Sequence, residues 1–180
     1  MKETLFRILK RGEKEERQEV PKKTIGLIID GPNILRKEFG IKLEDIMEAL
    51  TRIGSVRIAK VILNQYAPQG LIEAVVNQGL EPVIVAGDTD VRVAIEAMEM
   101  IYNADVDVIA LASRDADFLP IIIEAKRRGK ETVVIGVDPG FSVALQNAAD
   151  YVIKMESSRA VDRNGERSLG GPERGNRPGA

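Results

Sequence analysis

Apolar and polar residues follow one another along the chain in blocks that predict strands and helices in turn. Short β-branched apolar runs such as "TIGLII" and "VDVIALA" are typical of buried strands. Longer stretches repeat an apolar residue every three or four positions, which is the spacing of an amphipathic helix. The predicted strands cover residues 24–29, 56–63, 81–86, 106–112, 131–137 and 151–155, and the predicted helices cover residues 43–53, 69–79, 90–103, 117–129 and 141–149.

The alternation of these elements predicts the fold class. Strands that alternate with helices form βαβ units around a parallel sheet. The strands are almost continuously apolar, as expected for parallel strands that are covered on both faces. With right-handed crossovers we expect an α/β domain, a three-layer αβα sandwich on a doubly wound parallel sheet of five to six strands. Ligands of such domains bind beyond the carboxyl ends of the strands, where the strand order reverses.

The two ends of the chain differ from this domain, which is expected over residues 24–155. Residues 1–23 form a charged N-terminal arm, in which "TLFRIL" could make a short helix that docks on a partner or a second copy of the chain. A mobile arm is the other interpretation. Residues 156–180 are rich in Gly, Pro and Arg and predict a disordered tail, with a loose RNA contact as the alternative.

The composition excludes several kinds of chemistry. The 180 residues carry a net charge of −2 and include no Cys and no His. This excludes disulfides, thiolate zinc sites, Cys nucleophiles and Ser-His-Asp hydrolysis. A metal site would have to use oxygen ligands, which favours Mg²⁺ or Mn²⁺. No apolar run approaches the ~20 residues of a membrane span and the N-terminus does not resemble a secretory signal, so we expect a cytoplasmic protein.

Acidic residues follow three of the predicted strands. Asp30 closes the first strand, Asp115 and Asp117 follow the fourth, and Asp88 and Asp90 follow the third. Because parallel strands end at one edge of the sheet, these acids converge if the first and fourth strands are neighbours. Each could instead cap a helix or shape a turn. Caps do not need a doublet at two helix starts, and crowded carboxylates call for a cation, so we favour a shared metal site.

Other polar residues near these acids have two interpretations each. Asn33 could bridge a metal-bound water or a phosphate, or only make a turn, and Ser113 could contact a ligand or only end a strand. Glu96 is either a solvated charge or an acid that supports the site. Four cations could contact a phosphate backbone, although exposed cations usually only solubilise; these are Arg36, Lys37, Arg92 and Arg114.

Four segments in order resemble a known family. They are "LIIDGPNI", "DVRVAIEAM", "ALASRDADFLPIIIEAKRRGKETVVIGV" and "SVALQNAADYVIKM". Together they resemble the NYN domain of the LabA/DUF88 type, in the PIN-like nuclease superfamily, from about Thr24 to Met155. The combination is specific: a D-G-x-N turn, an Asp that opens a helix, and an S-x-D-x-D-F-x-P block.

The resemblance implies a PIN-like sandwich and a Mg²⁺- or Mn²⁺-dependent ribonuclease that acts on RNA, expected to be single-stranded. Asn33 matches the polar partner in the first turn, Ser113 matches the serine of the block, and Glu96 stands where relatives often have Asp. The family's acidic set, implied to hold the metal and act in catalysis, falls on Asp30, Asp90, Asp115 and Asp117.

The chain departs from the family pattern at two places. Relatives usually read S-G-D-x-D, and here Arg114 replaces the Gly. Relatives often carry K-G-x before the helix acid, and here "AGDT" adds Asp88 and lacks the Lys. Neither change removes an implied ligand, so activity is expected to be retained.

A different class of function uses the same fold without hydrolysis. A non-catalytic RNA-binding or regulatory module would use the crevice and its basic flanks, although a pure binder has no reason to crowd carboxylates against phosphates. Phosphoryl-transfer enzymes are disfavoured, because the first strand ends Asp30-Gly31-Pro32 and no P-loop or G-x-G-x-x-G turn is present. RNA and a second copy of the chain are the expected partners.

Overall fold

The computed structural model describes residues 22–157. Within this range one sheet holds six parallel strands in the order β3-β2-β1-β4-β5-β6. The sheet is doubly wound and its order reverses between β1 and β4, as the predicted architecture requires. The strands are β1 Thr24–Asp30, β2 Ser55–Asn64, β3 Glu81–Val85, β4 Val108–Ala112, β5 Glu131–Val137 and β6 Tyr151–Met155.

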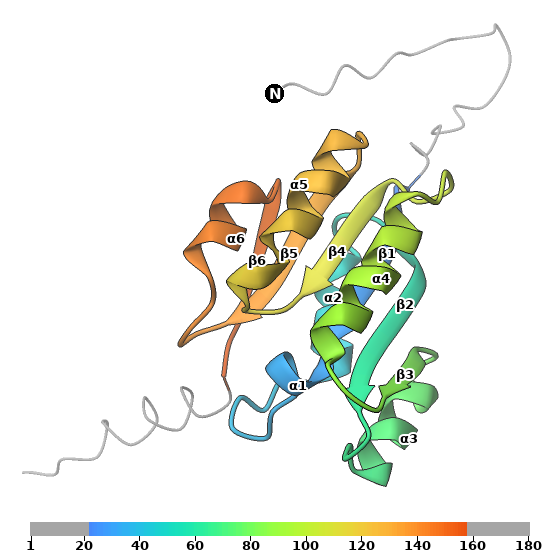
Figure 1. Ribbon diagram of the computed structural model, residues 1–180, viewed down its shortest axis with the longest axis vertical. Helices are drawn as coiled ribbons and strands as arrows, with labels where there is room; N and C mark the ends of the chain where they lie inside the picture. The colour runs from blue at the N-terminus through green and yellow to red at the C-terminus, as the bar shows by residue number, and fades with distance from the viewer. Residues whose placement is uncertain (1–21, 158–180) are drawn as a thin grey trace, which may run out of the picture.

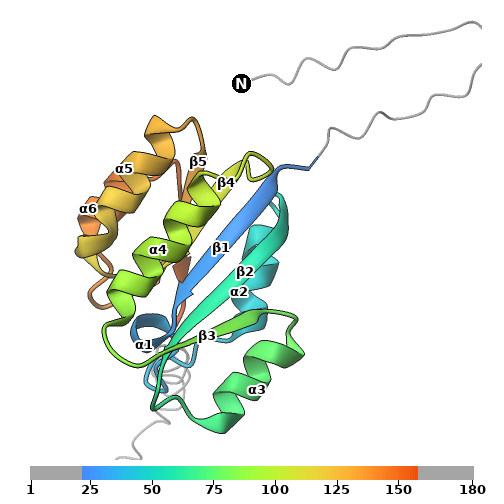
Figure 2. The ribbon, with the colours of Figure 1, turned by 45° about the vertical axis from the view of Figure 1, so that its right-hand side comes forward.

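Helices cover both faces of the sheet and make it a three-layer sandwich (Figures 1 and 2). In Figure 2 the helices α2 and α3 lie on one side of the sheet, and α4, α5 and α6 lie on the other. The helices are α1 Gly31–Ile34, α2 Leu43–Leu50, α3 Gln69–Asn77, α4 Thr89–Ile101, α5 Leu119–Arg127 and α6 Val143–Ala148, with a 3₁₀ turn at Ala116–Phe118 before α5.

The central strand β1 shows why the sequence folds this way. Every residue from Ile25 to Asp30 is buried, because helices pack on both sides. Ile25, Leu27 and Ile29 belong to the apolar core that includes residues of α2 and α3. Ile28 belongs to the opposite core, which α4, α5 and α6 complete. The alternation of strand side chains thus gives one apolar layer to each face.

The observed elements differ from the predicted ones mainly at their ends. Residues 31–34 form a short helix, where the sequence indicated only a turn, because Pro32 suits a first helical turn. Strand β4 begins at Val108 rather than at residue 106, because Asp107 binds the start of β1 instead. Its amide donates to the Thr24 carbonyl at 2.9 Å, and its carboxylate accepts from the Thr24 amide at 2.8 Å.

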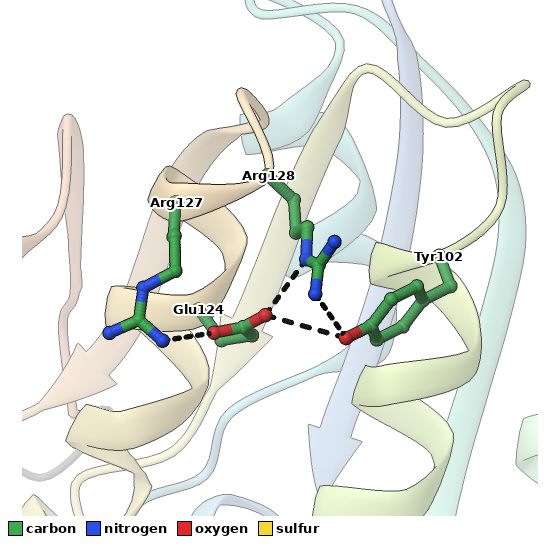
Figure 3. A network of polar contacts seen from close by, with 4 residues as sticks. All are labelled: Tyr102, Glu124, Arg127 and Arg128. Atoms are coloured by element: carbon green, nitrogen blue, oxygen red, sulfur yellow. Dashed lines mark hydrogen bonds and ion pairs between the residues drawn. The ribbon is translucent and has the colours of Figure 1, made fainter.

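A polar network joins α4 to α5 at the amino edge of the sheet (Figure 3). The Arg128 guanidinium lies over the Tyr102 ring, 4.6 Å from its centroid, and donates to the Tyr102 hydroxyl at 2.8 Å. Glu124 accepts hydrogen bonds from Arg128 at 2.9 Å and from Arg127 at 3.0 Å. These contacts stand at the ends of both helices, away from the edge that carries the acids.

The predictions for the two ends of the chain cover residues 1–23 and 156–180, of which 1–21 and 158–180 lie outside the described residues, and both stay predictions. No helix between residues 22 and 157 has the length and apolarity that crossing a membrane requires. The homodimer also stays a prediction.

Candidate functional site

The register of the central strands places Asp30 beside Ser113. Ile29 of β1 stands opposite Ala112 of β4, so the next residue of each strand meets at the carboxyl edge. The Ser113 hydroxyl donates to Asp30 Oδ2 at 2.9 Å, and both residues are buried. The predicted neighbourhood of the first and fourth strands is therefore present, with the switch in strand order at this contact.

Gly31 allows the chain to turn away directly after Asp30. A Cβ at this position would lie 2.6 Å from the Ile62 carbonyl oxygen and 2.7 Å from a methyl of Leu63. Only glycine leaves the backbone of α1 this close to β2, and this approach holds Asp30 at the end of its strand.

Both acidic doublets use their first member to start a helix. Asp88 accepts a hydrogen bond from the Asp90 amide at 2.9 Å and begins α4. Asp115 accepts from the Asp117 amide at 2.9 Å and begins the 3₁₀ turn before α5. The capping interpretation is thus correct for these two residues. A carboxylate has two oxygens, however, so a cap occupies only one of them.

The acids act on one another electrostatically across the switch point. Burial raises the pKa of Asp30 to about 6; the Ser113 hydrogen bond opposes this rise, and the charges of Asp90 and Asp115 add to it. Burial also raises the pKa of Asp90, and the charges of Asp88, Asp115 and Asp117 raise it further. The four acids that the sequence singled out therefore share one region of negative potential.

This region could hold a hard divalent cation. Its donors are carboxylate oxygens with no Cys or His among them, which suits Mg²⁺ or Mn²⁺. Between residues 22 and 157, no three acidic side chains are oriented so that they could hold one ion together as they stand. Asp115 is turned toward the Asp117 amide and Asp30 toward Ser113, so binding would require the acids to turn toward a common point.

Asn33 contacts Arg114 in this structure. Its side-chain oxygen accepts hydrogen bonds from the Arg114 amide and from Arg114 Nε, both at 3.2 Å. These bonds join the turn after β1 to the turn after β4. Arg114 lines a hollow of about 410 Å³ beside the acids, together with Asn33, Asp115, Ala116, Gly140 and Ser142.

The other candidate cations lie in different surroundings. Arg36 forms an ion pair with Glu38 at 3.1 Å in the loop between α1 and α2, and Lys37 is exposed in the same loop. Arg92 lies 2.5 Å from the Glu96 carboxylate, so its charge is already paired. Of the four candidates, Arg114 is the one that lines the hollow next to Asp115.

A comparison with known protein families matches the part of the chain that forms this site. The family model of the NYN domain matches residues 24–156, which include the whole sheet and every acid described above.

The chain belongs to the NYN domain family.

This membership confirms the resemblance seen in the sequence and places the chain in the PIN-like nuclease superfamily. The LabA/DUF88 subtype is not specified by the match and stays a prediction.

Two individual proteins are similar to this NYN domain protein. The uncharacterised protein MJ0482 of Methanocaldococcus jannaschii is 58% identical over 139 residues, which are 77% of this chain and 58% of that protein. The chain thus spans less than two thirds of that relative. The crystal structure of VPA0982, a protein of unknown function from Vibrio parahaemolyticus, has a TM-score of 0.65 at 22% identity over 77% of this chain and 96% of the other. At this identity the likeness shows the fold alone.

Glu96 of the NYN domain is neither solvated nor among the coupled acids. Its side chain is 0% exposed and contacts Lys60 Nζ from β2. Arg92 Nη2 approaches its other oxygen at 2.5 Å, an ion-pair contact without hydrogen-bond geometry. Burial raises the pKa of Glu96, but Lys60 and Arg92 together outweigh it and lower this pKa overall. The ion pair fixes α4 on β2, and α4 carries Asp90.

Replacing Glu96 by Ala is expected to destabilise the domain by about 3 kcal/mol, at the lower end of the loss caused by breaking a buried ion pair. The change leaves Lys60 half-buried without its main partner, and an unpaired buried charge is strongly unfavourable. The matched control is Glu99→Ala, because Glu99 is 64% exposed and lies 3.5 Å from the same lysine. Chemical denaturation measures both free energies of unfolding. Equal losses of stability for the two variants would contradict the assignment of Glu96 as the main partner of Lys60.

Several residues near the site were not singled out from the sequence. Gly140 and Ser142 follow β5, so the rule that ligands bind beyond strand ends could have found them. Lys60 lies within the apolar run "VRIAKVIL", and an ionisable residue in a two-sided buried strand is a sign of a buried partner. Phe39, which packs under Arg114, gives no such sign, because its contact depends on how the loop between α1 and α2 folds back.

Proposed function

We propose that this protein is a divalent-metal-dependent ribonuclease that cuts RNA phosphodiester bonds at the switch point of its sheet. The observation that supports the proposal most is the convergence of acids from three strand ends around the buried Asp30. Ionised acids that raise one another's pKa destabilise the free site, and a bound cation would remove that repulsion.

In this proposal Asp30, Asp90, Asp115 and Asp117 hold Mg²⁺ or Mn²⁺. A bound ion of this kind would supply an activated water and stabilise charge on the phosphate oxygens. Ser113 keeps the Asp30 carboxylate in place through its hydroxyl. Asn33 fixes the turn after β4 through the Arg114 amide, and so positions Asp115. The substrate is proposed to be single-stranded RNA in the cytoplasm.

A cleavage panel on the purified chain tests this function. Labelled single-stranded RNA, double-stranded RNA and single-stranded DNA are each incubated with EDTA, Mg²⁺, Mn²⁺ or Ca²⁺. We expect cleavage of single-stranded RNA with Mg²⁺ or Mn²⁺ and none with EDTA. RNA binding that is equally tight with EDTA, without cleavage under any metal, would instead support the non-catalytic RNA-binding module.

A further inference from the structure

The hollow beside the acids contains one positive charge, on Arg114. Its other lining residues are Asn33, Ala116, Gly140 and Ser142, which are neutral, and Asp115, which is acidic. Within residues 22–157 no carboxylate forms an ion pair with Arg114, although acids surround the neighbouring turn. A half-buried guanidinium that forms no ion pair can attract an anion from solution.

The guanidinium of Arg114 is held by three contacts with neutral groups. One face lies over the Phe39 ring, 4.4 Å from its centroid. Nε donates to the Asn33 side-chain oxygen at 3.2 Å, and Nη1 donates to the Pro139 carbonyl oxygen. Arginine usually loses side-chain freedom when it binds a ligand. Here these contacts already restrict that freedom, so less of it is lost when a ligand binds.

Gly140 leaves room for this arrangement. A Cβ at this position would lie 3.2 Å from Arg114 Nη1, and the φ angle of +93° is one that other residues rarely adopt. The loop after β5 therefore accommodates the arginine, and a side chain there would crowd it.

One donor group of Arg114 remains available. Nε and Nη1 are bound as described, whereas no residue between 22 and 157 accepts a hydrogen bond from Nη2. Arg114 and Asp115, which is one of the acids of the proposed metal site, line the same hollow. An anion that Nη2 binds in this hollow would lie beside a phosphate that binds at the proposed metal site.

We propose that Arg114 binds a backbone phosphate of single-stranded RNA next to the phosphate that is cut, with one nucleotide of that strand in the 410 Å³ hollow. This inference rests on the proposed function for the identity of the cut phosphate. The hollow is near the lower end of the ~300–1,000 Å³ range of small-ligand sites, which suits one unpaired nucleotide rather than a duplex. Arg114 thereby compensates the repulsion between the substrate and the acids.

The test measures RNA binding without cleavage. The full chain in EDTA is titrated against a fluorescein-labelled ten-nucleotide uridine RNA at several salt concentrations, and anisotropy gives the affinity. We expect Arg114→Ala to weaken binding about tenfold, which corresponds to one charge-assisted contact. The slope of log affinity against log salt should fall by about 0.7, the contribution of one phosphate contact on a single strand.

Two further variants make the result specific. Arg114→Lys keeps the charge but not the planar fork, so we expect a few-fold weaker binding with the parent's salt slope. Arg128→Ala is the matched control, because Arg128 also lies over an aromatic ring and donates to neighbouring oxygens, but at the opposite edge of the sheet. It should bind RNA as the parent does. Equal weakening by Arg128→Ala, or an Arg114→Ala variant with the parent's affinity and slope, would overturn the proposal. Should Arg114→Ala fail to fold, a parental affinity for Arg114→Lys would also overturn it.

The titration and the cleavage panel together separate this inference from the proposed function. RNA binding that depends on Arg114, in a chain that shows no RNA cleavage with any of the metal ions, would support the phosphate site and refute the ribonuclease. If the chain cleaves RNA with metal but Arg114→Ala binds RNA as tightly as the parent does, the ribonuclease is supported and the phosphate site is refuted.

Discussion

Asp115→Asn is expected to lower Mn²⁺-stimulated cleavage of single-stranded RNA by more than about a hundredfold while the fold is preserved. Removing a group that only supports a metal ligand already lowers activity by about 10- to 100-fold, and Asp115 is proposed to be a ligand itself. The fold is preserved because asparagine keeps the oxygen that accepts from the Asp117 amide, and Asn caps helices as well as Asp does.

This substitution separates the two roles of Asp115. If capping were its only role, the asparagine variant would cleave RNA as fast as the parent. Asp45→Asn is the matched control, since Asp45 is an exposed acid in the first turn of α2 and its charge is not among those that raise the pKa of Asp30 or Asp90. Single-turnover cleavage assays and a thermal melt of each variant measure activity and fold separately. Cleavage by Asp115→Asn at the parental rate would refute the assigned site.

Asp30→Asn is expected to stabilise the metal-free domain at neutral pH. Burial raises the pKa of Asp30 from 3.8 to about 6, so the folded chain binds this proton more tightly than the unfolded chain does. The resulting stability is present below about pH 4 and is lost as the pH rises to about 6. Above pH 6 the ionised carboxylate destabilises the fold by up to about 3 kcal/mol, and asparagine removes this charge.

The pH dependence of this difference is the decisive measurement. Urea denaturation in EDTA should show the variant and the parent equally stable near pH 4, with the variant more stable by up to about 3 kcal/mol at pH 7. Asparagine can still accept the hydrogen bond from Ser113, so that contact is retained. Asp105→Asn, at an exposed loop position, should show no such difference. A variant less stable than the parent at pH 7 would mean that the buried carboxylate charge does not destabilise the fold.

Much of the architecture could be predicted from the pattern of apolar residues. Parallel strands buried on both faces leave uninterrupted apolar runs, and "TIGLII" and "ETVVIGV" mark β1 and β5 almost to the residue. The short helix α1 escaped prediction because four residues are too few for a periodic pattern, and its Pro and Gly also suit a turn.

For the candidate site, the sequence could predict which residues follow the carboxyl ends of the strands. The placement of Asp30 next to the turn after β4 follows from topology and register. The orientation of side chains does not: the sequence left Asn33 with either a metal or phosphate contact or a turn role, and could not show that its side-chain oxygen accepts from Arg114. The burial of Glu96 escaped prediction too, because it depends on Lys60 from a strand 36 residues away.

The pairing of β1 with β4 has a consequence for the growing chain. Ser113 and Asp30 are 83 residues apart in sequence, and β1 is the central strand whose second neighbour is β4. During synthesis, which proceeds from the N-terminus at roughly 5–20 residues per second, one edge of β1 stays unpaired until β4 has left the ribosome. Contacts this distant in sequence also form slowly. A nascent or truncated chain that ends before residue 112 therefore lacks an assembled acidic centre, which forms only once most of the domain has been made.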